Sequence, residues 1–191
     1  MELRNDLTGP TEIHLVKSGV KPSPEVVFVH GLGGNWRTTW MSDPENDDTY
    51  WPIWLGDTIP QINVWSAQYP ASPSLWMGRS LDLLTNAISL LDRLTQKPLT
   101  HPIVFVCHSL GGLVVKQLLR AASDLTATDD FIRIGESTVG IAFLGTPHTG
   151  SNIADTIKRV TTLLGGLGEV GLGGLLRLST IYKSKIPILR I

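Results

Sequence analysis

Short apolar runs alternate with longer amphipathic segments along most of this chain. Runs of four to six residues, rich in β-branched and aromatic side chains, are typical of buried strands in a parallel sheet. The clearest is Val26-Val-Phe-Val29, which a glycine-rich turn ends abruptly. The strands predicted in this way are Glu12 to Lys17, Val26 to Val29, Ile62 to Ala67, Ile103 to Val106, Val139 to Leu144 and Ile186 to Ile191.

The segments between these runs have helical periodicity. Between Ser80 and Gln96 an apolar stripe precedes Pro98, and its members are Leu81, Leu84, Ile88, Leu91 and Leu94. Leu110 to Ala122 and Asn152 to Leu164 are also predicted helices. Residues 35–60 hold four tryptophans and a polar insert, which predicts a surface excursion followed by a short helix around Trp54. Strands alternating with helices indicate βαβ units and the α/β class.

Composition and charge narrow the possible functions. The 191 residues suit one domain with a sizeable core, and a net charge of −1 gives no electrostatic case for nucleic acid. A single cysteine rules out an internal disulfide and, with no signal-peptide core at the N-terminus, predicts an intracellular, cytoplasmic protein. No run of 18 apolar residues encodes a transmembrane helix. Because the chain stops inside or just after a strand, we expect a C-terminally truncated fragment.

The most informative segment is Val104-Phe-Val-Cys-His-Ser-Leu-Gly-Gly-Leu-Val-Val-Lys116. An apolar strand ends here, Ser109 follows, and a glycine-rich turn opens an amphipathic helix. This pattern predicts a nucleophile elbow, in which the serine hydroxyl projects clear of the backbone. Cys107 replaces the first glycine of the usual Gly-x-Ser-x-Gly pattern but is small enough for the turn. The alternative is an ordinary strand and helix with an incidental serine.

Glycines also follow the first core strand, in His30-Gly-Leu-Gly-Gly34. In parallel sheets, ligand chemistry lies at the carboxyl ends of the strands, where glycines allow close approach of the backbone to a substrate. An oxyanion hole needs two preorganised N–H donors from different segments, and the N–H groups of Leu32 and Leu110 are the candidates. The alternative is a plain tight turn.

The histidines leave two alternatives open for a general base. Phe143-Leu-Gly-Thr-Pro-His-Thr-Gly-Ser151 ends the strand after the elbow strand. His148 in this loop either shapes the rim of the site or acts as the base. His108 is expected to pack or cap, His14 and His101 to lie on the surface, and Cys107 to be a packing residue. No spacing of histidine, cysteine and carboxylate residues predicts a metal site, and no cofactor is expected.

A glycine-rich apolar segment runs from Leu163 to Leu178. It predicts either a lid over an apolar substrate or a flexible connection between helices.

Three motifs in order resemble those of the α/β-hydrolase superfamily: Val27 to Gly34, Val104 to Gly112 and Phe143 to Ser151. They are similar to the lipase-like branch that includes serine active site-containing proteins, the GPI inositol-deacylases and the DUF676 serine esterases. Trp51-Pro-Ile-Trp-Leu55 adds to the resemblance, which covers roughly residues 24–191. It implies a doubly wound, mainly parallel sheet in one α/β-hydrolase domain over residues 1–191. Residues 1–23 would be an N-terminal extension or edge strand, and the C-terminal strand and helix would be missing.

The resemblance also implies a function. Ser109 is then the nucleophile, with the backbone of Leu32 and Leu110 as oxyanion donors, and the acid and histidine of the triad fall beyond Ile191. We expect a serine esterase or lipase that acts on carboxylic, lipid-like esters through an acyl-enzyme and takes part in lipid metabolism. The alternative is a non-catalytic or effector module of a larger signalling protein. Family resemblance further suggests mitochondrial or endoplasmic-reticulum association.

Overall fold

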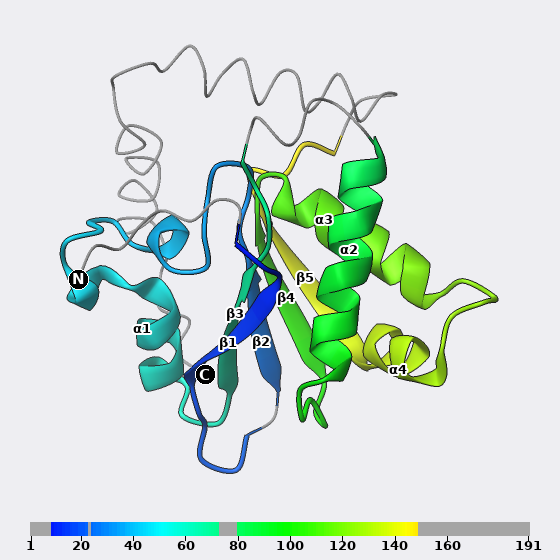
Figure 1. Ribbon diagram of the computed structural model, residues 1–191. Coiled ribbons are helices and arrows are strands. Elements are labelled where there is room, and N and C mark those ends of the chain that lie inside the picture. Colours follow the sequence, from blue (N-terminus) through cyan, green and yellow to red (C-terminus); the bar gives the residue numbers. More distant parts are fainter. Residues whose placement is uncertain (1–8, 23, 73–79, 149–191) are drawn as a thin grey trace.

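The computed structural model describes residues 9–22, 24–72 and 80–148 (Figure 1). Its strands are β1 (Glu12–Lys17), β2 (Glu25–Val29), β3 (Asn63–Gln68), β4 (Ile103–His108) and β5 (Thr138–Leu144). Its helices are α1 (Trp51–Thr58), α2 (Ser80–Thr95), α3 (Gly111–Ala122) and α4 (Asp129–Ser137), with short 3-10 helices at Thr38–Trp40 and Asp47–Thr49. The predictions for residues 152–164, 163–178 and 186–191 lie outside the described residues.

The strands form a mainly parallel sheet in the order β1-β3-β2-β4-β5. Only β1 runs antiparallel to its neighbour, and it forms one edge of the described sheet. Val27 at the centre lies opposite Trp65 of β3 and Phe105 of β4. The predicted α/β class and parallel sheet are confirmed. Because β2, β4 and β5 are parallel neighbours, the loops that follow them meet at one edge of the sheet.

Helices cover both faces of this sheet (Figure 1). α2, α3 and α4 pack together on one face, and α1 with the segment before it lies on the other. The residues of β4 alternate between the two faces, since Phe105 and Cys107 belong to the core under α2 and α3, and Val106 belongs to the opposite core. His108 continues this alternation and lies on the α1 side.

The prediction of a surface excursion at residues 35–60 is wrong for Trp40 and Tyr50, whereas the short helix predicted around Trp54 is confirmed as α1. Trp40, Met41 and Tyr50 are almost completely buried and form the core on the α1 side of the sheet. The ring of Phe28 lies 4.9 Å from that of Trp40 and 5.1 Å from that of Trp51. Residues 42–48 of the polar insert are exposed, as are residues 57–60 at the end of the segment. Isolated aromatic residues have no periodic spacing, so the sequence does not indicate which face of the sheet they cover.

The helix predicted at Ser80 to Gln96 is confirmed, and Leu91 and Leu94 of its predicted apolar stripe are buried. Ile88, placed in the core by the sequence pattern, is 40% exposed. The buried apolar residues described in α2 are Leu83, Ala87, Leu90, Leu91 and Leu94. The two stripes both have helical spacing, and the small side chain of Ala87 suits the face that packs against α3.

Helix α4 was not predicted. Its N-terminus carries a local signal, because the Thr128 hydroxyl accepts a hydrogen bond from the N–H of Phe131 at 3.3 Å. Asp129 and Asp130 in the first turn also complement the helix dipole. The helix is short, and this cap was the signal that could have located it.

A fully buried carboxylate lies at the amino end of β2. Oε2 of Glu25 accepts a hydrogen bond from Nε1 of Trp65 at 2.7 Å, and Oε1 lies 3.0 Å from Nδ1 of His101. The sequence predicted a surface position for His101, but the ring is only about one-third exposed and pairs with this carboxylate. Buried charged groups need such partners, since an unpaired one is costly.

Trp65→Phe is therefore expected to lower the free energy of unfolding by about 2–4 kcal/mol, measured by urea denaturation. The substitution removes buried ring volume and leaves Oε2 of Glu25 without its donor. Trp54→Phe is the matched control, because the indole of Trp54 makes its hydrogen bond to Asp48 in an exposed position. Equal effects of the two substitutions would contradict the role assigned to the Glu25 pair.

Candidate active site

A sharp turn joins β4 to α3, as the sequence pattern predicts. Ser109, between the end of β4 and the start of α3, has a φ of +50°. This left-handed conformation is unfavourable for a residue with a side chain, by about 1–2 kcal/mol. The Ser109 N–H donates a hydrogen bond to the carbonyl of Leu144 at 2.9 Å, which ties the turn to the end of β5. Strain of this kind is often retained at functional sites.

Small residues let the strand and the helix pass closely at this turn. A Cβ atom at Gly111 would overlap the carbonyl oxygens of His30 and Val29, at the end of β2. Cys107 is fully buried, and this burial raises the pKa of its thiol to about 12. The thiol therefore stays protonated near neutral pH, which agrees with the interpretation of Cys107 as a packing residue.

The loop after β2 lies directly against the turn. A side chain at Gly31 would begin 2.8 Å from Cβ of Ser109. Leu32 and Leu110 are both buried, and neither backbone N–H donates a hydrogen bond to another described residue. Two buried donors from different segments, beside one serine, are what an oxyanion hole requires. The predicted residues are thus neighbours in space.

Tyr69 holds the loop after β2 in place, and the sequence pattern did not reveal this residue. Its hydroxyl donates a hydrogen bond to the carbonyl of His30 at 2.5 Å, and its ring stacks on the His30 ring at a centroid distance of 4.3 Å. Nδ1–H of His30 donates to the carbonyl of Gly31 at 2.9 Å. Complete burial lowers the pKa of His30 to about 4, so the ring is neutral at physiological pH. His30 is a structural support of the loop.

The loop after β5 packs against the first turns of α3. A side chain at Gly112 would overlap Thr146. Nδ1 of His148 lies 2.8 Å from the ammonium group of Lys116, and the ring of His148 packs edge-on against Phe143. An ammonium group only donates, so Nδ1 of His148 is the acceptor and its ring proton lies on Nε2. This arrangement favours the rim position over the role of base.

His148→Gln is accordingly expected to keep ester turnover within about threefold of the unsubstituted protein, because general-base loss costs about 10²-fold or more. Steady-state hydrolysis of a p-nitrophenyl ester measures this. Lys116→Met serves as the companion substitution, since it removes the donor to His148 without changing the imidazole. A fall of a hundredfold or more in His148→Gln alone would make His148 the base.

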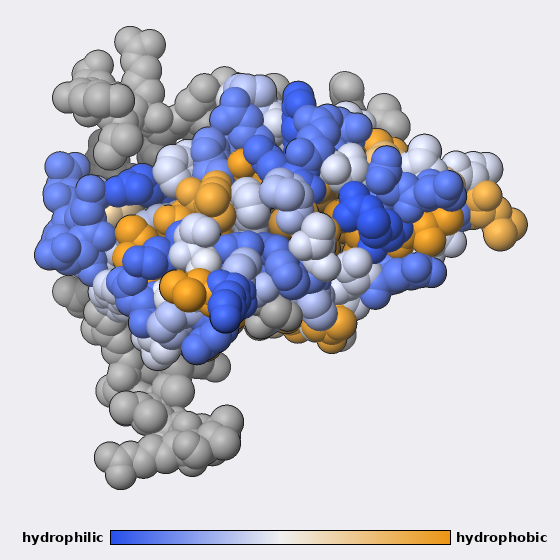
Figure 2. Space-filling model, turned by 90° about the horizontal axis from the view of Figure 1, so that it is seen from below, coloured by the Kyte–Doolittle hydropathy of each residue, from blue (hydrophilic) through white to orange (hydrophobic). Residues whose placement is uncertain are grey.

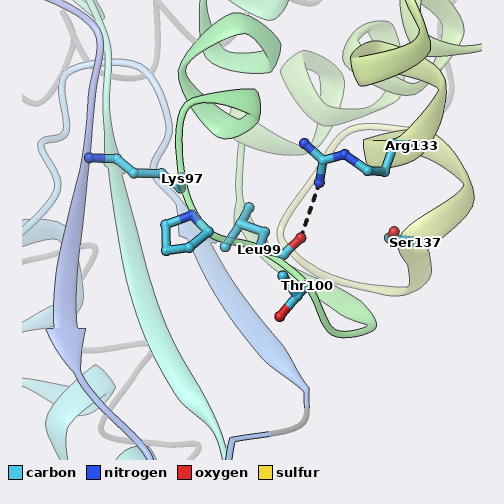
Figure 3. Close-up of a pocket in the computed structure, with 6 residues that line it drawn as sticks. Lys97, Leu99, Thr100, Arg133 and Ser137 are labelled. Carbon is cyan, nitrogen blue, oxygen red and sulfur yellow. Dashed lines mark hydrogen bonds between the residues drawn. The ribbon is translucent and has the colours of Figure 1, made fainter.

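A cavity of about 540 Å³ lies far from this turn, at the amino end of β4. It is lined by residues of the α2–β4 connection and of α4 (Figure 3). Arg133 extends from α4 and donates a hydrogen bond to the carbonyl of Leu99 at 3.1 Å. The side chain of Lys97 points away from Arg133 (Figure 3). Since a six-residue strand spans about 20 Å, this cavity is separate from Ser109.

No group of three or more histidine, cysteine, aspartate or glutamate residues within the described ranges could hold a metal ion. No helix in the described part of the chain is long and apolar enough to cross a membrane. Figure 2 looks onto the amino ends of the parallel strands, where hydrophilic side chains predominate and apolar ones are scattered among them.

Comparison with known proteins gives sequence relatives. No family model matches the chain. It is 32% identical to human protein SERAC1 over 161 residues, which are 73% of this chain and 24% of that protein. The SERAC1 proteins of Mus musculus and Danio rerio are 30% and 31% identical over a similar extent. The chain thus spans about a quarter of the length of these relatives, and the match agrees with the lipase-like branch predicted from the three motifs.

Two solved structures have weaker similarity to the chain. The type II thioesterase BorB from the borrelidin biosynthetic cluster has a TM-score of 0.41 at 17% identity, covering 71% of this chain and 49% of that one. An inhibited esterase B from Lactobacillus rhamnosis has a TM-score of 0.40 at 15% identity, covering 84% and 52%.

Proposed function

We propose that this chain, whose three motifs resemble those of the α/β-hydrolase superfamily, is a serine hydrolase that cleaves carboxylic esters, with lipid-like esters as its substrates. One observation carries the proposal: Ser109 occupies the apex of a strand–turn–helix with a φ of +50°, directly beside the loop after β2. A strained serine at this position is otherwise an unexplained cost to the fold. Ser109 is the nucleophile, and the N–H groups of Leu32 and Leu110 are the oxyanion donors.

The reaction begins when Oγ of Ser109 attacks the ester carbonyl carbon while a general base takes the hydroxyl proton. The carbonyl oxygen becomes an oxyanion, which the two N–H groups bind. The oxyanion then collapses, the C–O bond to the alcohol breaks, and the alcohol leaves with the proton. Water attacks the acyl-enzyme in the same way and releases the acid.

The amino end of α3 adds to the stabilisation of the oxyanion. The peptide dipoles of a helix sum to a partial positive charge at its N-terminus, and the first turn of α3 begins two residues after Ser109. Leu110, the N-cap residue of α3, is fully buried, so water screens the interaction weakly. The negative charge of the transition state therefore develops in a favourable field.

The proposal is tested with the purified full-length protein. A fluorophosphonate probe should label it covalently at Ser109, identified by peptide mass spectrometry, and p-nitrophenyl esters of increasing acyl length should be hydrolysed. A preference for longer acyl chains would support lipid-like substrates. Absence of both labelling and turnover would instead favour the non-catalytic module, in which the fold serves recognition within a larger protein.

A further inference from the structure

Nε1 of Trp40, whose side chain is almost completely buried, and Nδ1 of His108 are buried atoms near Ser109 with no hydrogen-bond partner within the described part of the chain. Nε2 of His30 and Oγ1 of Thr146, in the loops after β2 and β5, also have none, but Trp40 and His108 are the pair whose rings contact each other. Nearly all buried polar side-chain atoms in proteins are hydrogen-bonded, so two exceptions in contact with each other call for an explanation. The activity proposed above uses neither atom.

The two rings lie together on the α1 side of the sheet. Their centroids are 6.3 Å apart and their planes are at 76°, an edge-on arrangement. His108 directly precedes Ser109, and a side chain at Gly31 would begin 3.3 Å from Nδ1 of His108. The imidazole therefore lies between the indole of Trp40 and the loop that faces Ser109.

The other described neighbours of Trp40 cannot supply the missing acceptor from their aromatic rings. Phe28 packs against the indole at 4.9 Å, and Trp51 lies 6.0 Å away. An indole is a donor only, and a phenyl ring has no conventional acceptor. Among the described rings in contact with Trp40, only His108 therefore carries an acceptor nitrogen.

The chemistry of the pair restricts the group that it can bind. Burial lowers the pKa of His108, which favours the neutral ring with one donor and one acceptor nitrogen. With Nδ1 as the acceptor, the pair presents one N–H donor and one lone pair. A hydroxyl group satisfies both atoms, because its oxygen accepts from Trp40 and its hydrogen donates to His108. A carboxylate or phosphate oxygen only accepts, and an ammonium group only donates.

We propose that Trp40 and His108 form a subsite for a hydroxyl group of the substrate, so that the preferred esters carry a free hydroxyl near the ester bond. The position of the ester relative to this subsite rests on the proposed function. Binding of the hydroxyl group does not depend on it. His108 is only half-buried, so its ring is within reach of a ligand.

Binding is measured without catalysis, by following the indole N–H signals of the ¹⁵N-labelled full-length protein. The ligands are the non-hydrolysable ethers 2-hydroxyethyl octyl ether and propyl octyl ether, which differ by a hydroxyl in place of a methyl group. The Trp40 signal, identified by its absence in Trp40→Phe, should move downfield with the hydroxyl ether only. Equal responses to both ethers, no response to either, or a ligand-independent contact with a buried water would overturn the proposal.

Specificity supplies a second readout. The ratio of kcat/KM for 2-hydroxyethyl octanoate to that for propyl octanoate should fall about tenfold in Trp40→Phe, the effect expected for one lost hydrogen bond. Trp51→Phe is the matched control, because it changes a neighbouring indole of the same cluster and should leave the ratio unchanged. An unchanged ratio in Trp40→Phe would contradict the subsite. Loss of all hydrolysis with an intact Trp40 response would count only against the proposed function.

Discussion

Ser109→Ala is expected to lower ester turnover by about 10³-fold or more and to abolish labelling by a fluorophosphonate. Removing a nucleophile leaves only the oxyanion donors and substrate binding, which by themselves retain about 10³–10⁴-fold acceleration over water. The fold should survive, because alanine has less bulk than serine and the Ser109 N–H keeps its bond to Leu144. Steady-state kinetics and probe labelling of the full-length protein measure the effect.

Ser123→Ala is the matched control for this experiment. Ser123 lies at the other end of α3, where its exposed hydroxyl bonds the carbonyl of Leu119 at 2.9 Å. Ester turnover and probe labelling of the Ser123→Ala variant should match those of the unsubstituted protein. If labelling persists in Ser109→Ala at the same rate, Ser109 is not the nucleophile.

Gly111→Ala is expected to destabilise the protein by about 3 kcal/mol, at the upper end for overpacking, and to lower the Tm by about 6–12 °C. The added methyl group would overlap the carbonyl oxygens of His30 and Val29, which are backbone atoms and cannot rotate away. Either α3 or the loop after β2 must therefore move. Because that loop carries Leu32, we expect turnover to fall along with stability.

Gly140→Ala in β5 provides the comparison, because a methyl group there would meet only side-chain atoms of Val104 at 3.9 Å. This is ordinary van der Waals contact, and the Tm should change little. Thermal unfolding by circular dichroism measures both variants. Equal Tm values for Gly111→Ala and the unsubstituted protein would show that α3 and β2 tolerate a wider separation.

Much of the fold could be predicted because its signals are local. The strands around Val27 and Phe105 are short apolar runs bounded by turn residues, and their order with intervening helices indicates a parallel sheet. The turn at Ser109 was predictable for the same reason, since strand, small residues and helix follow one another within a dozen residues. Leu32 and Leu110 could be proposed together because the carboxyl ends of parallel strands share one edge.

Other features depend on partners far apart in the chain. Tyr69 supports the carbonyl of His30 across 39 residues, and His101 pairs with Glu25 across 76. No local pattern shows these pairs, and each residue alone looks like a surface or strand position. Trp40 likewise has no periodic context, and only the packed sheet shows that it lies in a core next to His108.

The sequence by itself determined the class of fold, the order of its strands along the chain and the position of the serine turn. Tertiary structure alone decided that Ala87 and not Ile88 lies on the buried face of α2, which histidine supports the loop after β2 and which one meets Trp40. The physical reason is range. Backbone propensity and hydrophobic periodicity act over a few residues, whereas burial and hydrogen-bond pairing depend on the three-dimensional neighbours that the whole chain brings together.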